Sequence, residues 1–288
     1  MPTASRPVSI AIPASFIDVR ENLAQQTIQI SRIARAAAIF RVDEIVVYPD
    51  QSSRAQARQR RLITSILEYM ETPQYLRKYL FAKQSELRYA GLLPPLRTPH
   101  HPVEKRAQML RDGDLREGYA FYHKGRTVVD VGVERPLPLQ NQLPRNAPGR
   151  VTVHIKRPAE DLLEASLASP NARREYWGYR VTDAQRPLAD FLSQASSQSL
   201  IVATSRKGTP VGDVWTALQT RWREATRVLI LFGSHAEGLT EIMRRQGHEL
   251  ISVAHYVINT IPSQGVATVR TDEAVLLTLA VFRLLEVL

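Results

Sequence analysis

The sequence contains no cysteine among its 288 residues. This absence excludes disulfide bonds, thiolate catalysis and zinc sites built on thiolates. No run reaches the eighteen apolar residues that a membrane-spanning helix needs. Residues 1–7 lack the apolar core of a secretory signal peptide. Together these absences predict a soluble intracellular protein with no membrane partner.

Lysine is also scarce, since it supplies only six of the 38 basic residues, and arginine supplies the rest. The formal net charge is +10. A strongly basic chain favours a polyanionic partner, most often nucleic acid. Arginine suits that partner, because its guanidinium forks onto phosphate and stacks on bases. The competing interpretation is that the arginine excess reflects genome composition or heat adaptation.

Buried strands followed by polar turns predict an α/β domain. Residues 8–12 and 43–48 read as strands on either side of a helix at 23–40, which indicates a parallel pair. Later apolar runs begin at residues 200, 228 and 256, and each leads into a turn containing glycine. In parallel sheets, ligands bind at the carboxyl ends of strands. Glycine serves where the backbone approaches a ligand closely. The pattern therefore predicts a ligand crevice at those three turns.

Other segments have simpler interpretations. The polar stretch 51–61 precedes a predicted helix at 62–70. A second helix is predicted at 74–81, and an aromatic strand at 176–181. Residues 204–210 are predicted to form a polar glycine turn after the strand at 200–203. Further helices are predicted at 188–194, 214–223 and 274–288, the last of them apolar on almost every side.

The middle of the chain has a different composition. Proline-rich segments at 91–102 and 136–148 flank short strands at 118–122 and 127–133, with another strand at 150–156. This pattern predicts a small antiparallel OB-like barrel, whose arginines and aromatic residues would suit single-stranded nucleic acid. An insert that only braces its host is an equally good interpretation. The predicted domains are 1–87 and 159–288, which form one α/β domain, and the insert 88–158.

Several strings of residues resemble one family. They are IARAAAIF (33–40), VDEIVV (42–47), LRYAGLLPPL (87–96), PHH (99–101), YWGY (176–179), ATS (203–205), QG (264–265) and TVRTDEA (268–274). They are similar to the archaeal and eukaryotic RNA methyltransferases of the SPOUT superfamily, the family that includes human centromere protein 32. The resemblance covers nearly the whole chain in order.

The resemblance implies an α/β fold with a SPOUT-type trefoil-knotted parallel sheet and an inserted small OB-like β-barrel domain. It implies S-adenosylmethionine as methyl donor, with S-adenosylhomocysteine as product, and a homodimer through the knot. The implied target is RNA, and ribosomal RNA is the expected kind. The expected product is N3-methyluridine, although other SPOUT branches methylate ribose or guanine. Expected localisation is cytoplasmic for an archaeal protein and nucleolar or nuclear for a eukaryotic one.

In the family, the cofactor lies in three loops at the knot, which correspond here to residues 204–208, 233–238 and 258–268. Each follows an apolar strand, and backbone groups in glycine turns can clasp adenine and ribose. The implied cofactor-binding residues are Ala203, Thr204, Ser205, Gly208, Leu231, Phe232, Gly233, Gly238, Ile258, Asn259, Thr260, Ile261, Pro262, Gln264, Gly265, Thr268 and Val269.

The resemblance also implies the residues that act on RNA: Arg35, Arg270 and Asp18 as catalytic residues, and Arg32, Arg35, Arg126 and Arg270 as RNA-binding residues. In many SPOUT proteins the last motif reads Ser-Leu-Asn-Val, and here it reads Thr-Val-Arg-Thr at 268–271. Arginine has a pKa above about 12 and cannot act as an ordinary base. It can instead hold a phosphate or stabilise developing charge.

The proton acceptor is left open by the sequence. Candidates are Asp18, Glu237, Asp272 and His235. Asp272 is explained as well by a position in the first turn of a helix, and Asp18 by a solvated loop. His100 and His101 are adjacent between prolines and lack ligand geometry, so no metal is expected.

The leading alternative function is a catalytically weak RNA-binding ribosome-assembly factor that keeps the fold. An oxidoreductase with a nucleotide cofactor is excluded, because Ile12-Pro13-Ala14-Ser15 stands where its glycine fingerprint would be.

Overall fold

The computed structural model describes residues 6–18, 20–51, 54–141, 143–144, 148–159, 162–169, 172, 175–194, 199–234 and 236–287. The chain divides into two compact units. The first, called the sheet unit, consists of Met1–Glu68, Ser85–Pro94 and Tyr179–Leu288. The second, called the barrel unit, consists of Tyr69–Gln84 and Pro95–Gly178. This division differs from the predicted boundaries at 88 and 158, because a further strand after residue 158 pairs within the barrel unit.

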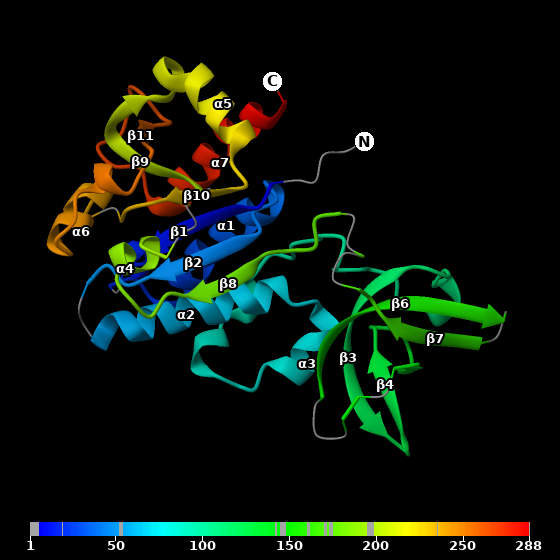
Figure 1. The fold of residues 1–288 in the computed structure, drawn as a ribbon. Helices are drawn as coiled ribbons and strands as arrows, with labels where there is room; N and C mark the ends of the chain where they lie inside the picture. Colours follow the sequence, from blue (N-terminus) through cyan, green and yellow to red (C-terminus); the bar gives the residue numbers. More distant parts are fainter. Residues whose placement is uncertain are drawn as a thin grey trace. The chain divides into compact units, whose positions relative to one another are not determined.

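The sheet unit is built on six parallel strands in the order β11-β9-β10-β1-β2-β8 (Figure 1). The strands are β1 (Val8–Pro13), β2 (Glu44–Tyr48), β8 (Arg180–Asp183), β9 (Ser199–Pro210), β10 (Arg227–Leu231) and β11 (Tyr256–Asn259). Strands β1, β2 and β10, and β9 as far as Ala203, read as nearly continuous runs of apolar residues, as expected of strands covered on both faces. The predicted α/β class with a parallel sheet is therefore confirmed.

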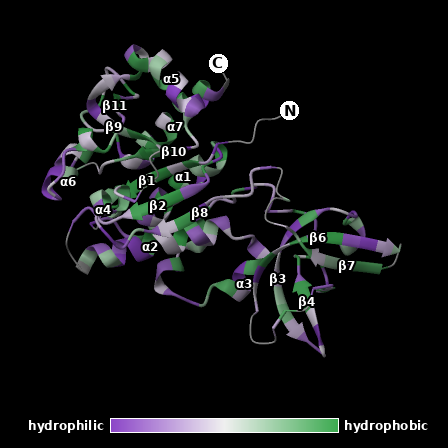
Figure 2. Ribbon diagram, in the orientation of Figure 1, coloured by the Kyte–Doolittle hydropathy of each residue, from purple (hydrophilic) through white to green (hydrophobic). Residues whose placement is uncertain are grey.

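Helices cover the sheet. The helices of this unit are α1 (Leu23–Ile39), most of α2 (Arg54–Glu71), α4 (Leu188–Leu192), α5 (Trp215–Glu224), α6 (Leu239–Arg245) and α7 (Thr271–Val287). Helices α4 and α6 pack on one sheet face in a single apolar cluster. Helix α7 packs against α1 and α5, with Trp222 and Phe282 in edge contact at 5.3 Å. Figure 2 shows the apolar colour concentrated in the central strands. No helix within the described ranges is long and apolar enough to cross a membrane.

Two elements differ from the sequence-based prediction. The arginine-rich stretch that was predicted to precede a helix is itself helical, because α2 already begins at Arg54. Arginine, glutamine and alanine are strong helix formers, and an exposed face needs no apolar residues. The predicted strand at 176–181 starts only at Arg180, where the backbone begins to pair with β2.

The barrel unit contains a five-stranded antiparallel sheet in the order β5-β4-β3-β6-β7. Its strands are β3 (Leu115–His123), β4 (Arg126–Asp130), β5 (Leu137–Pro138), β6 (Gly149–Ala159) and β7 (Leu162–Leu167), and it also holds α3 (Arg77–Leu80). A bridge between Leu139 and Ala165 joins the two edges, so that the sheet is nearly closed. Apolar side chains from all five strands fill the interior. The predicted small β-barrel is therefore confirmed.

A buried polar network holds the barrel unit together. Arg150 donates two hydrogen bonds to the carboxylate of Glu71, at 2.6 and 3.0 Å, and a third to Glu117 at 2.6 Å. His100 and His101 each donate to the carbonyl oxygen of Glu71. Burial alone would raise the pKa of Glu71, but hydrogen bonds from His100 and Arg150 outweigh burial and lower this pKa to about 2. The ionised carboxylate is thus part of the folded state.

Stability should fall on acidification in two steps. Burial, together with the charge of His100, lowers the pKa of His101 from 6.5 to about 4. The contribution of the neutral His101 to the free energy of unfolding is complete above pH 6.5. It is lost as the pH falls towards 4, because the unfolded chain then binds the proton more readily. That of Glu71 is complete above its ordinary pKa of 4.5 and is lost as the pH falls towards 2.

The measurement is urea unfolding at a series of pH values in a Trp215→Phe, Trp222→Phe background, where Trp177 reports on the barrel unit. We expect His101→Gln to flatten the decline between pH 6.5 and 4 by up to about 3 kcal/mol. An unchanged pH profile in this variant would contradict the assignment to His101.

Candidate functional site

The carboxyl end of β9 forms the first wall of the site. Val257 of β11 pairs with Ala203, but its neighbour Ile258 pairs with Thr209. Residues 204–208 of β9 are therefore an insertion of five residues between two pairs whose partners in β11, Val257 and Ile258, are adjacent. The prediction of a simple turn at 204–210 was wrong in detail, because the chain resumes pairing with β11 at Thr209–Pro210. The polar residues still leave the sheet at the predicted place.

Gly208 is required by this geometry. A Cβ atom at Gly208 would lie 2.6–2.8 Å from backbone atoms of Ile258. Real Cβ atoms do not come so close to neighbouring backbone atoms. The two strands can therefore resume pairing after the excursion only because residue 208 has no side chain.

The second wall follows β10. Tyr48 donates its hydroxyl to the carbonyl of Phe232 at 2.6 Å, and Thr204 donates to the carbonyl of Leu231 at 2.9 Å. Burial raises the pKa of Tyr48 well above its ordinary value, so that this donor stays protonated. Beyond Phe232, the Ser234 hydroxyl accepts a hydrogen bond from the amide of Glu237 at 3.0 Å and closes a tight turn. The bond from Thr204 holds the carboxyl ends of β9 and β10 together.

The third wall follows β11 and leads into α7. Asn259 donates to the carbonyl of Arg206 at 3.0 Å and accepts from the amide of Ile261 at 2.9 Å. The hydroxyls of Thr260 and Thr278 are 2.8 Å apart. Thr271 donates to the carbonyl of Gly233 at 3.0 Å. Asn259 thus joins the third wall to the first, Thr260 joins the third wall to α7, and Thr271 joins α7 to the second wall.

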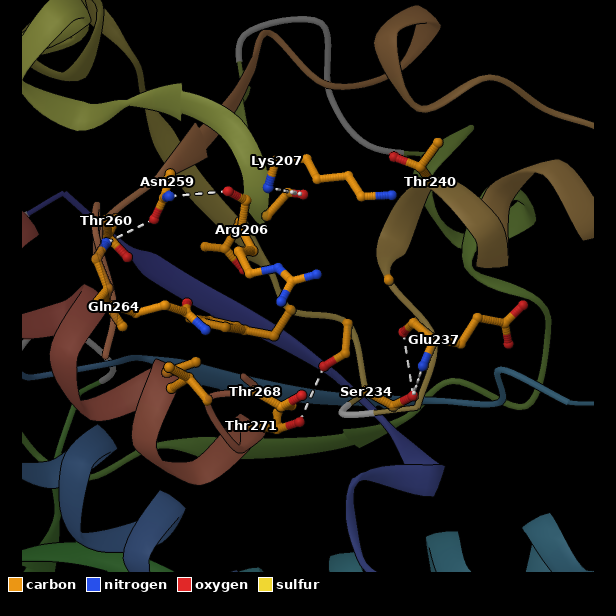
Figure 3. A pocket seen from close by; sticks show the side chains of 18 of the residues that line it. Arg206, Lys207, Ser234, Glu237, Thr240, Asn259, Thr260, Gln264, Thr268 and Thr271 are labelled. Atoms are coloured by element: carbon orange, nitrogen blue, oxygen red, sulfur yellow. Dashed lines mark hydrogen bonds between the residues drawn. The ribbon is translucent and has the colours of Figure 1, made fainter. Parts of the chain in front are cut away.

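These walls enclose a cavity of about 390 Å³. Figure 3 shows Asn259 and Thr260 on one side and Ser234 and Glu237 on the other, with Arg206 between them. Its lining combines threonine and serine hydroxyls with charges of both signs. The residues are Thr204, Ser205, Arg206, Lys207, Phe232, Gly233, Ser234, Ala236, Glu237, Gly238, Thr240, Glu241, Asn259, Thr260, Ile261, Gln264, Ala267, Thr268, Val269, Thr271, Ala274 and Thr278. Such a lining suits a polar, zwitterionic small molecule.

Most of the cofactor residues implied by the family resemblance lie around this cavity. Those in the lining are Thr204, Ser205, Phe232, Gly233, Gly238, Asn259, Thr260, Ile261, Gln264, Thr268 and Val269. The others lie outside the lining: Ala203 and Gly208 in β9, Leu231 in β10, Ile258 in β11, and Pro262 and Gly265 in the loop after β11. Whether any of them binds a cofactor stays a prediction.

Other lining residues were not predicted from the sequence. Thr240 and Glu241 begin α6, and Ala274 and Thr278 lie on α7, one turn apart. A helical spacing of small and hydroxyl residues on α7 was the available signal, but the apolar composition of this helix concealed it. Arg206 was also passed over, although its guanidinium donates to the carbonyl of Ala267 at 2.6 Å.

The predicted catalytic and RNA-binding arginines of the sheet unit lie outside the cavity lining. Arg32 of α1 donates to the carboxylate of Asp272, at the start of α7, at 3.1 Å. Arg270, just before that helix, lies 3.9 Å from Glu21 and its side chain is 58% exposed. Arg35 follows Arg32 by almost one turn of α1 and is half-buried. Arg270 directly precedes Thr271 of the cavity, and Arg32 contacts Asp272, the residue after it.

The remaining candidates are placed separately. Asp18 forms an ion pair with Arg20 at 2.8 Å. Glu237 lines the cavity and pairs with Arg245 at 2.5 Å. Asp272 is buried, and its Oδ1 has no hydrogen-bond partner among the described residues. Arg126 belongs to the barrel unit, and His235 lies outside the described residues. Among the described residues, no group of three or more histidine, aspartate or glutamate side chains could hold a metal.

Comparison with known proteins gives a consistent result. A model of the protein family described as "Putative RNA methyltransferase" matches residues 7–282. A 28S rRNA (uridine-N(3))-methyltransferase of Drosophila melanogaster is 33% identical over 95% of this chain, which spans 61% of the length of that relative. The Homo sapiens protein of the same name is 31% identical over 95% of this chain and 77% of its own. An uncharacterized protein of Halobacterium salinarum is 31% identical over 96% of this chain and 99% of its own.

Substitution of Gly208 tests the architecture of the cavity. We expect Gly208→Ala to lower the free energy of unfolding by about 1–3 kcal/mol, because the Ile258 backbone cannot yield to the added methyl group. The matched control is Gly212→Ala, since a Cβ there would meet nothing within 4 Å. Equal unfolding midpoints for the two variants in urea would contradict this account of β9.

Proposed function

We propose an enzymatic function for this cavity, because the chain belongs to the "Putative RNA methyltransferase" family. The proposed reaction transfers the methyl group of S-adenosylmethionine to N3 of a uridine in ribosomal RNA and releases S-adenosylhomocysteine. The observation that carries this proposal is the cavity at the carboxyl ends of β9, β10 and β11, in a chain that matches the family over almost its whole length.

The residues present fit such a cofactor. A volume of about 390 Å³ falls within the range of small-molecule pockets. Glu237 and Glu241 provide negative charge for an ammonium group, and Arg206 and Lys207 provide positive charge for a carboxylate. The hydroxyls of Thr204, Ser205, Thr260 and Thr268 suit ribose. When bound, the sulfonium cofactor supplies a methyl group that is already activated for transfer.

The chain then has to hold the uridine in line and help its N3 proton to leave. Arg35 and Arg270 are proposed to bind the nucleotide and its phosphate, and Arg32 to bind the flanking backbone. The buried carboxylate of Asp272 fixes the position of Arg32. We propose Asp18 as the residue that accepts the proton. Glu237 is the competing acceptor, because it lines the cavity itself.

A second copy of the chain is proposed to cover an apolar surface formed by α1 and α7. Leu277 and Leu284, seven residues apart on α7, are 43% and 48% exposed. Ile28 and Ile39 on α1 are 40% and 53% exposed. Since α1 and α7 pack on one another, an isologous contact between two copies would remove these side chains from water. The trefoil knot stays a prediction from the family resemblance.

The test of function is incubation of the protein with S-adenosylmethionine carrying a tritiated methyl group and with ribosomal RNA, followed by nucleoside digestion and mass spectrometry. The proposal expects label in N3-methyluridine. RNA binding without any turnover would instead support the assembly-factor function. Label in ribose or in another base would overturn the choice of atom.

Arg35→Ala should lower the rate of methyl transfer about a hundredfold or more and leave the affinity for S-adenosylhomocysteine nearly unchanged. The reason is that Arg35 lies outside the cavity lining and is proposed to contact the nucleotide. Arg223→Ala, an exposed arginine on α5, is the matched control. Wild-type turnover in Arg35→Ala would exclude the role.

Leu277→Arg should convert the proposed dimer to a monomer, because it places a charge on the apolar surface. Sedimentation velocity gives the mass directly. Ile251→Arg, at a residue that is 79% exposed in the same unit, is the control and should remain dimeric. A wild-type protein that sediments as a monomer at micromolar concentration would contradict the dimer.

A further inference from the structure

The outer face of β3 carries a row of aromatic rings that the reaction does not use. Tyr119, Phe121 and His123 are spaced two residues apart, so that they point to the same face of the barrel sheet, about 6.7 Å apart along the strand. The ring centroids of Tyr119 and Phe121 are 6.3 Å apart, as are those of Phe121 and His123. The row therefore continues from the middle of the strand to its end.

One end of the row is rigid. Tyr79 of α3 stacks on Tyr119 with centroids 4.5 Å apart and ring planes within 1°. Its hydroxyl donates to Asp130 at 2.8 Å, and Lys78 pairs with the same carboxylate at 3.0 Å. Because these contacts fix both tyrosines, Phe121 has a fixed aromatic neighbour in Tyr79, with ring centroids 6.1 Å apart. The aromatic surface is thus formed before any ligand arrives.

The other end of the row is open and basic. Phe121 is half-buried and His123 is exposed. Beyond His123 the chain turns through Lys124 and Gly125, which both have positive φ, as a tight two-residue hairpin requires. Arg126 lies directly opposite His123 in the antiparallel register and shares its face. Lys124 and Arg126 are both exposed, so that two cations lie next to His123, Lys124 in the chain and Arg126 across the hairpin.

We propose that Phe121 and His123, supported by the Tyr79–Tyr119 stack and flanked by Lys124 and Arg126, bind single-stranded RNA by stacking of its bases. This inference deepens the proposed function, on which it rests for the choice of RNA. Rings accept bases of any sequence, and the cations contact the adjacent phosphates. A duplex cannot use the rings, because its bases already stack on one another.

The test measures binding of the full-length protein to fluorescein-labelled oligouridine of about a dozen nucleotides by anisotropy, with an RNA duplex of the same length as the comparison. Phe121→Leu keeps the apolar bulk and removes the ring, and should weaken binding to oligouridine about tenfold with little change for the duplex. Phe121→Trp should retain wild-type affinity. Met109→Ala, at an exposed residue of the same unit, is the control.

The roles of rings and cations separate in the dependence on salt. Arg126→Ala should lower the slope of log affinity against log salt by about one, whereas His123→Ala should weaken binding with the slope unchanged. Because His123 is exposed, His123→Ala keeps the test decisive if the Phe121 variants do not fold. Wild-type oligouridine affinity in His123→Ala and Phe121→Leu, or equal losses on single strand and duplex, would overturn the proposal.

The two proposals fail in different ways. If the protein methylates ribosomal RNA but binds oligouridine equally well without the rings, the stacking proposal is wrong and the enzymatic function stands. Ring-dependent oligouridine binding by a protein that never transfers a methyl group would do the reverse.

Discussion

The pairing of β9 with two neighbours at once is the constraint on which the site depends. β9 runs between β10 and β11, and pairs with both as far as Ala203. Four polar residues and Gly208 then interrupt the pairing with β11, which resumes at Thr209. Because Gly208 has no side chain, its backbone can lie against the backbone of Ile258, and β9 can pair with β11 again at Thr209. Arg206, Asn259 and Thr204 join this excursion to the other two walls.

The barrel unit depends on a different kind of interaction. The carboxylate of Glu71 is buried there together with the guanidinium of Arg150 and the imidazoles of His100 and His101. Buried charges are tolerated only when they are paired and hydrogen-bonded. The adjacent histidines thus have a structural role as donors to the backbone carbonyl of Glu71.

The general fold was predictable from the sequence, and the detailed site was not. Apolar runs such as the one starting at Val228 predict buried parallel strands, and Gly233 predicts a turn after one of them. The return of β9 to the ladder at Thr209 has no local signal, because it depends on the register of β11, about fifty residues later in the chain. Likewise, the contribution of Thr278 follows from its hydroxyl contact with Thr260, the residue after β11. Tertiary contacts of this kind are absent from periodicity and composition.

The central claim is that the three walls bind S-adenosylmethionine. Isothermal titration of the purified protein with S-adenosylhomocysteine tests it directly, without any assumption about the RNA. We expect saturable binding at one site per chain with a dissociation constant in the micromolar range, which corresponds to a binding free energy of about −8 kcal/mol. Absence of binding by a folded protein that still binds RNA would contradict the claim and leave a chain that holds RNA without modifying it.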